Sequence, residues 1–307
     1  MSRPYTTFIG IDLGGSRGKS TAVARLRWNG GAGEPVWVDE VVTRHNGEPW
    51  SDEVLIDYLR RIGPSAVVAI DAPLTVPACL ACHVPVCPGY EACEVPATVW
   101  LRTVGEEMQS RSLAKGGDRV ATMSGRSTSR AGVAPSASKQ RLAPYTHRPT
   151  EVYLHYQRDL VPRDQLSHGT SPVAARAAHL RRVLATHGFI LNQNLLEVSP
   201  RSTVQALFGR RRARGYKRDA DPWNTRAQIV EELGCQSGAG QSGEAGSMRF
   251  APSSRMSKEE VLRNDHCFDA LLSGYTAFLW ARDGWQVPPD AVDFASHGFI
   301  WVPPAPR

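Results

Sequence analysis

The chain has 307 residues, of which 41% are hydrophobic and 21% charged, which is the composition of an ordinary globular protein. Its formal net charge of +6 arises from 36 basic and 30 acidic residues, a mild excess that favours a polyanionic partner. No apolar run approaches the length of a membrane helix, and the first predicted strand begins too early to leave room for a signal peptide. We therefore expect a cytoplasmic protein without membrane contact, whose six cysteines are reduced thiols or metal ligands.

The first seventy residues predict a meander of three strands followed by a crossover. Strands are expected at 8–13, 21–28 and 36–43, a helix at 51–62 and a fourth strand at 66–71. The first and fourth strands are almost free of polar residues until each ends on an aspartate, Asp12 and Asp71. Such strands are typically buried in the centre of a sheet. Open α/β sheets bind their ligands at the carboxyl ends of these strands.

The remaining chain predicts helices, one more strand and two insertions. Residues 105–143 and 236–256 are rich in small and polar residues, and we expect both segments to be mobile loops. A helix is expected at 174–187, a short fifth strand at 195–198, and a long helix from Ser257 onwards. This order predicts a single α/β domain over residues 1–307, built on one mixed sheet flanked by helices.

Five acidic residues occupy positions from which these elements can bring them together. Asp12 and Asp71 end strands, and Glu197 lies in the fifth strand. Asp265 and Asp269 are four residues apart near the start of the last helix, so both project from one face. Magnesium and manganese prefer such oxygen ligands. A pair of these ions can activate water and stabilise the charge on a phosphodiester during hydrolysis.

Each acid also has a structural alternative. Asp265 is suited to be a helix N-cap, and Asp12, which precedes glycines, is suited to start a turn. Glu197 can pair with Arg201, which follows it closely. Taken together in the order strand, strand, strand and helix, the acids favour a metal site.

The segments that carry these acids form a recognisable series. They are Ile9-Gly10-Ile11-Asp12, Ala69-Ile70-Asp71-Ala72-Pro73, Leu196-Glu197-Val198-Ser199-Pro200 and Asp265-His266-Cys267-Phe268-Asp269-Ala270-Leu271. Further matches are Pro144-Tyr145-Thr146-His147-Arg148, Gly215-Tyr216-Lys217-Arg218 and Gly298-Phe299-Ile300-Trp301-Val302-Pro303. In this order the chain resembles the predicted-nuclease family of ribonuclease H-like fold, domain of unknown function 429.

The resemblance implies a ribonuclease H-like five-stranded mixed sheet and a metal-dependent nuclease. It implies metal-binding roles for Asp12, Asp71 and one or both of Asp265 and Asp269. It also implies a catalytic role for Glu197, with the alternative that the family's glutamate anchors a basic residue. On the same resemblance, His147 and Arg148 line the cleft, and Arg148 contacts nucleic acid.

The glycine-rich turn after the first strand has two rival interpretations. A P-loop is excluded by spacing, because the position five before Gly18 is Leu13 and not glycine. Sugar kinases, actin and chaperone ATPases place an aspartate and glycines at a similar turn to hold ATP phosphates. Such an ATP-binding phosphotransferase or ATPase needs a second similar half, and no second copy is evident in the sequence. A plain hairpin turn with solvated Arg17 and Lys19 remains the simplest alternative.

Four of the six cysteines follow the fourth strand within fifteen residues. Cys79, Cys82, Cys87 and Cys93 have the spacing C-x2-C-x4-C-x5-C, with His83 as a possible replacement ligand. Four thiolates on one short loop suit zinc or an iron–sulfur cluster. The alternatives are four free thiols or, less in keeping with the expected compartment, disulfides. Residues 79–93 are therefore predicted to be a metal-binding loop beside the carboxylates.

The densest positive run lies at 210–218 and predicts contact with DNA or RNA. Its candidate contacts are Arg210, Arg211, Arg212, Arg214, Tyr216, Lys217 and Arg218. Basic side chains neutralise phosphates without sequence choice, and the interleaved tyrosine is suited to stack on a base. Lys217 is the best single candidate for contacting the scissile phosphate, and we assign it a catalytic role.

Two alternatives to a nuclease remain open at this point, the ATP-binding phosphotransferase or ATPase described above and a non-catalytic module. The run at 210–218 is equally compatible with a solvated charged surface. A non-catalytic nucleic-acid-binding or redox-sensing module would use the same fold, with the cysteines as its working part. A protein partner is also left open.

Overall fold

The computed structural model describes residues 2–15, 20–31, 33–115, 142–160, 162, 171–235, 247–254, 258–288 and 298–304. One mixed sheet of seven strands organises these segments, in the order β8-β3-β2-β1-β6-β7-β9. Its strands are β1 (Thr7–Asp12), β2 (Ala22–Arg27), β3 (Val36–Val42), β6 (Val67–Asp71), β7 (Leu195–Val198), β8 (Met248–Phe250) and β9 (Ile300–Trp301). A separate two-stranded pair consists of β4 (Arg44–His45) and β5 (Glu48–Pro49).

The strand directions follow the expected meander and crossover. β1, β2 and β3 pair antiparallel, whereas β1–β6, β6–β7 and β7–β9 pair in parallel. All five strands expected from the sequence form, and they are consecutive in the sheet. The structure adds an edge strand at each side, and β8 pairs in parallel with β3 inside the segment 236–256 that was expected to be a loop.

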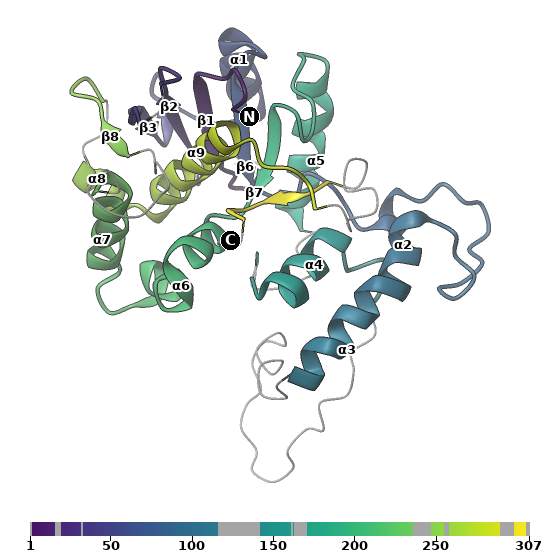
Figure 1. Cartoon of the computed structure of the whole chain (residues 1–307). Helices are drawn as coiled ribbons and strands as arrows, with labels where there is room; N and C mark the ends of the chain where they lie inside the picture. Colours follow the sequence, from purple (N-terminus) through teal and green to yellow (C-terminus); the bar gives the residue numbers. More distant parts are fainter. Residues whose placement is uncertain are drawn as a thin grey trace.

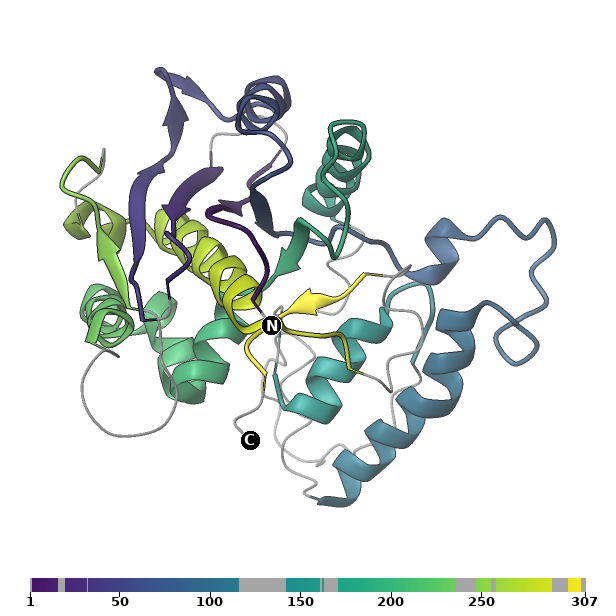
Figure 2. The same cartoon turned by 45° about the horizontal axis from the view of Figure 1, so that its top comes forward.

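Helices cover both faces of the sheet (Figures 1 and 2). They are α1 (Asp52–Ile62), α2 (Pro96–Trp100), α3 (Glu106–Lys115), α4 (Pro149–Arg158), α5 (Pro172–Ala185), α6 (Pro200–Arg218), α7 (Pro222–Cys235), α8 (Lys258–Arg263) and α9 (Asp265–Asp283). α1 and α5 contact each other over one face, and α9 packs on β1, β2 and β6 over the other. No helix in the described part of the chain is both long and apolar enough to cross a membrane.

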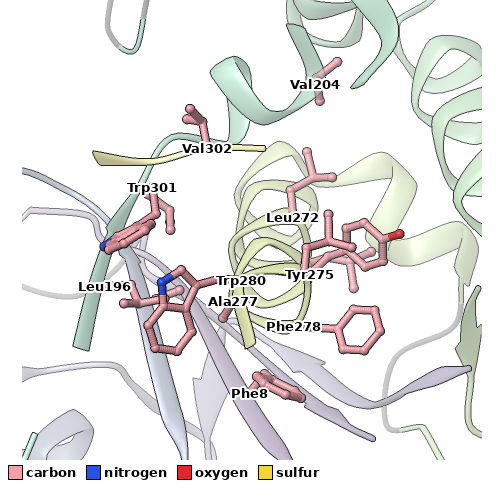
Figure 3. Packing of buried hydrophobic residues seen from close by; sticks show 14 of the residues in the cluster. Phe8, Leu196, Val204, Leu272, Tyr275, Ala277, Phe278, Trp280, Trp301 and Val302 are labelled. Atoms are coloured by element: carbon pink, nitrogen blue, oxygen red, sulfur yellow. The ribbon is translucent and has the colours of Figure 1, made fainter. Parts of the chain in front are cut away.

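Strand β1 shows why each face has its own core. Successive side chains of a strand point to opposite faces, so Phe8 joins the cluster around α9 whereas Ile9 and Ile11 join the cluster beneath α1 and α5. On the α9 face, Phe8 contacts the ring of Phe278 edge-on, with centroids 5.8 Å apart (Figure 3). All four residues from Phe8 to Ile11 are buried, as expected for a central strand.

Helix α9 is buried around nearly its whole circumference. Every residue from Cys267 to Ala281 is buried, as is typical of a helix that runs through the core and not along the surface. The single helix expected from Ser257 is two helices, because Asn264 interrupts it and caps α9. The side chain of Asn264 accepts hydrogen bonds from the amides of His266 and Cys267, which corrects the alternative that Asp265 is the N-cap.

The loop expected at 105–143 is also partly helical. A π-helical segment (Leu101–Gly105) continues into α3, whose Gln109 donates a hydrogen bond of 3.0 Å to the hydroxyl of Tyr156 on α4. The composition of this segment gives little sign of a helix. Packing against α4 stabilises α3, and that contact is not visible in the local sequence. Residues 116–141, and residues 236–246 of the second insertion, lie outside the described residues.

Candidate metal centre

Asp12 and Asp71 lie side by side at the edge of the sheet. β1 and β6 are parallel neighbours, and their register pairs Asp12 with Asp71 directly. The side chain of each is half-buried, because each follows a fully buried run and stands where its strand leaves the core. Two neighbouring carboxylates repel each other unless a positive group lies between or beside them.

Asp269 of α9 completes a group of three carboxylates. One ligand oxygen from each of Asp12, Asp71 and Asp269 lies within 4.8 Å of the others. In the part of the chain that the structure describes, this is the one set of three or more candidate ligand residues that is so close. The strand register and the packing of α9 on β1 together bring residues from distant parts of the sequence to one point.

The environment of Asp269 is unfavourable for a carboxylate without a cation. Its side chain is buried, and its Oδ1 has no hydrogen-bond partner within the described structure. Burial raises the pKa of Asp269 to about 7, to which the charges of Asp12 and Asp71 add, whereas Lys217 opposes the shift. A buried acceptor that lacks a partner is costly, so this oxygen and its two neighbours suit a divalent metal ligated by oxygen.

Lys217 contributes the positive charge beside this group. Its Nζ forms an ion pair with Oδ2 of Asp269. Burial lowers the pKa of Lys217, but Asp269, Asp71 and Asp12 outweigh that effect and raise it, so the ammonium remains charged. The side chain is 40% exposed and therefore lies between the buried carboxylates and the solvent.

A break in helix α6 positions Lys217. Gly209 adopts a positive φ of 84°, which interrupts the helix between its two halves. The second half then places Tyr216 in the core, where its ring lies 5.5 Å from that of Phe268 on α9. Because Tyr216 is fully buried, the prediction that it stacks on a base is wrong.

His266 is a member of the site that the sequence analysis missed. Its Nδ1 lies 2.6 Å from Oδ2 of Asp12, and this hydrogen bond is the main cause that raises the pKa of His266. The signal that could have identified it is its position three residues before Asp269, which places both on one helix face. Asp265 is not part of the carboxylate group, because it lies one further turn, about 6 Å, along the helix axis from Asp269.

Glu197 lies apart from the three aspartates, in a buried ion-pair network. Its Oε1 and Oε2 accept hydrogen bonds of 2.9 Å from Nη2 and Nη1 of Arg148, and Oε2 also accepts one from the amide of Leu74. Arg148 further donates to Glu151 at 2.6 Å. The two carboxylates outweigh the effect of burial and raise the pKa of Arg148 above its ordinary value. The structure thus shows the alternative in which the glutamate anchors a basic residue.

Arg148 cannot reach a phosphate backbone from this position, since only 1% of its side chain is exposed. This corrects the prediction that Arg148 contacts nucleic acid. His147 is likewise buried, and its Nδ1 lies 2.9 Å from the amide of Ala143. Both residues are therefore buried and do not line an open cleft, and Arg148 ties the start of α4 to Glu197 of β7.

The basic run occupies the second half of α6 and is partly neutralised. Arg210 pairs with Asp159, and Arg212 pairs with Glu232. Arg211, Arg214 and Arg218 are exposed on the same segment. Arg211 and Arg214 thus remain available for the predicted contact with phosphates.

The predicted cysteine loop leaves the sheet at the end of β6. Cys79, Cys82 and Cys87 are exposed and Cys93 is half-buried, and the four side chains carry no disulfide. No three of the four sulfurs lie within 4.8 Å of one another, in contrast to the three aspartate oxygens. Residues 16–19 of the glycine-rich turn lie outside the described residues, and the described part of the chain holds one large sheet without a second copy.

Comparison with known proteins places the chain in a family without an established activity. No curated protein and no solved structure matches it. One family model covers residues 10–293, a range that contains Asp12, Asp71 and Asp269 as well as the four clustered cysteines. The chain therefore belongs to the family described as protein of unknown function, DUF429.

Proposed function

We propose that the protein is a metal-dependent nuclease that hydrolyses phosphodiester bonds of DNA or RNA. The observation that carries the proposal is the convergence of Asp12, Asp71 and Asp269, whose ligand oxygens lie within 4.8 Å of one another. Magnesium or manganese bound there would activate a water molecule and stabilise the charge that develops on the phosphoryl group. A ribonuclease H-like fold is part of the proposal, supported by the central strand order β3-β2-β1-β6-β7.

The carboxylates would have separate tasks in this centre. Asp12 and Asp71, which are half-buried at adjacent strand ends, would hold the ions where substrate can approach. Asp269 would bind from the buried side through Oδ1, which lacks another partner in the described structure. His266 would orient Asp12 through its hydrogen bond of 2.6 Å, in the manner of groups that fix a ligand from outside the coordination sphere.

Lys217 would act on the substrate. When a divalent cation takes over the charge of Asp269, the ammonium group no longer has to compensate that carboxylate. It is then available to a phosphate oxygen beside the reacting bond, where a positive charge stabilises the transition state. The exposed Arg211 and Arg214 of the same helix would contact flanking phosphates.

The test is cleavage by the Asp12→Asn variant. We expect the wild-type protein to cut members of a panel of single- and double-stranded DNA and RNA when Mg²⁺ or Mn²⁺ is added, and the variant to lose this activity. The substitution removes a charged ligand but keeps the shape of the side chain. Circular dichroism and thermal denaturation would show that the fold is retained.

Asp265→Asn is the matched control, because it removes a carboxylate from the same end of α9 outside the group of three. We expect it to keep most of the activity. Equal cleavage by wild type and Asp12→Asn would reject the proposal. Binding of nucleic acid without metal-dependent cleavage would favour the non-catalytic binding module instead.

A further inference from the structure

The loop between β6 and α2 carries four thiols that the carboxylate centre does not use. Its two ends are attached to the body of the protein. The amide of Cys79 donates a hydrogen bond of 3.1 Å to the carbonyl of Pro144, and the carbonyl of Cys93 accepts one of 3.2 Å from Arg102. Cys82 and Cys87 lie on the exposed stretch between these anchors.

This stretch buries too little apolar surface to be ordered by packing. Leu80, Val84 and Val86 are 54%, 50% and 80% exposed, so they are half of the exposed large hydrophobic residues found in the described chain. Ordering each backbone residue costs about 1–2 kcal/mol. A loop that does not offset this cost through burial needs another source of order, such as a metal ion.

The geometry around the sulfurs is suited to thiolate ligands. The amide of Val84 donates to Sγ of Cys82 at 3.5 Å, and a hydrogen bond to the charged form of a group favours that form, here the thiolate. Gly89 adopts a positive φ of 88°, which allows the chain to turn back between Cys87 and Cys93.

We propose that Cys79, Cys82, Cys87 and Cys93 bind one zinc ion that orders this loop. Zinc accepts four thiolates in a tetrahedron with Zn–S distances of about 2.3 Å, which requires sulfurs about 3.8 Å apart. No three of these sulfurs lie within 4.8 Å of one another in the described structure, so zinc binding requires the exposed stretch between the two anchors to close around the ion. The four thiol protons are released to solvent as the Zn–S bonds form.

Zinc fits this loop better than an iron–sulfur cluster does. The reduction potential of an iron–sulfur cluster depends strongly on solvent exposure and on the surroundings of its sulfurs. Three of these four cysteines are exposed. Zinc is redox-inactive and has no geometric preference of its own, so it tolerates irregular spacing on an exposed loop. The site would be structural, because all four positions are taken by protein ligands.

The experiment measures metal content of the full-length protein purified under reducing conditions without chelator. We expect elemental analysis to find zinc in a ratio near one to one. The double variant Cys82→Ser/Cys87→Ser should lose the zinc, and limited proteolysis within 79–93 should become several-fold faster. Val86→Ser, which changes an exposed residue of the same loop, should retain zinc and wild-type resistance.

Two further measurements separate this site from the carboxylate centre and from other metals. Asp12→Asn should keep its zinc, and the zinc-depleted protein titrated with Co²⁺ should show the strong visible bands of a tetrahedral tetrathiolate. The proposal is overturned by a double variant that retains zinc. It is equally overturned by a wild type that neither contains nor takes up zinc, or by a brown protein that contains iron and sulfide.

Discussion

At the scale of single residues, Asp269 has the most unusual environment in the candidate centre. Its carboxyl group is buried beside Asp12 and Asp71, and its pKa is raised from 3.8 to about 7. The folded protein therefore holds the proton of Asp269 more tightly than the unfolded chain does. The resulting stabilisation is fully present below the ordinary pKa and is lost as the pH rises through the folded pKa.

We expect the contribution of Asp269 to the free energy of unfolding to fall as the pH rises between about pH 4 and pH 7, because the unfolded chain has already released the proton that the folded protein still holds. In buffer without Mg²⁺ or Mn²⁺, the stability of wild type should decline over this range relative to Asp269→Asn, which has no such titration. Added Mg²⁺ should remove the difference in slope, because bound metal stabilises the ionised form. Urea denaturation at several pH values measures the effect, and parallel pH profiles without the metal would contradict it.

Arg148 has a structural role that its position in a family motif does not reveal. Its guanidinium compensates the buried carboxylates of Glu197 and Glu151. We expect Arg148→Met to lower the free energy of unfolding by about 3–5 kcal/mol, because it leaves buried charges without a partner. Arg211→Met, at an exposed site on α6, should change it by less than about 0.5 kcal/mol. Similar urea denaturation curves for the two variants would argue against this network.

At the scale of elements, the contact between β1 and α9 determines the geometry of the centre. Gly10 lies against the backbone of α9, and a Cβ added there would be 2.0 Å from the carbonyl oxygen of Ala270 and 2.2 Å from the nitrogen of Gly274. Both neighbours are backbone atoms that cannot rotate away. The close approach therefore keeps Asp269 beside Asp12, two residues further along β1.

We expect Gly10→Ala to displace α9 and to weaken both folding and metal binding. The overlap with backbone atoms should cost at least the 1–3 kcal/mol that is typical of overpacked cores. Mn²⁺ affinity, measured by calorimetry, should fall in protein that remains folded. Gly15→Ala is the control, because an added Cβ there meets nothing within 4 Å. Wild-type stability and Mn²⁺ affinity in Gly10→Ala would show that the contact does not position Asp269.

The elements also differ in how well the sequence predicted them. The central strands and α1 were predicted within one or two residues, since long apolar runs and a serine cap mark them locally. The edge strands β8 and β9 have three and two residues, too few for a pattern, and their pairing depends on β3 and β7. Helix α3 was missed because its partner α4 lies far along the chain.

At the scale of the whole molecule, the candidate centre combines two kinds of residue. Asp12 and Asp71 are marked as strand ends by local sequence pattern, whereas only the fold brings Asp269 beside them. By itself, the sequence determined that Asp12 and Asp71 end buried strands, because hydrophobic pattern and strand ends are local properties. It also indicated Asp269 and the family, through motifs spread over most of the chain.

The tertiary structure decided which acidic residues lie together. The sequence left open whether Asp265, Asp269 or both bind metal, and whether Glu197 is catalytic or anchors a basic residue. In the structure, Arg148 neutralises Glu197 and the helical rise separates Asp265 from the group. His266 was found only because α9 brings it against Asp12. Charge compensation and desolvation depend on distances between segments remote in the chain, and only the packed fold sets those distances.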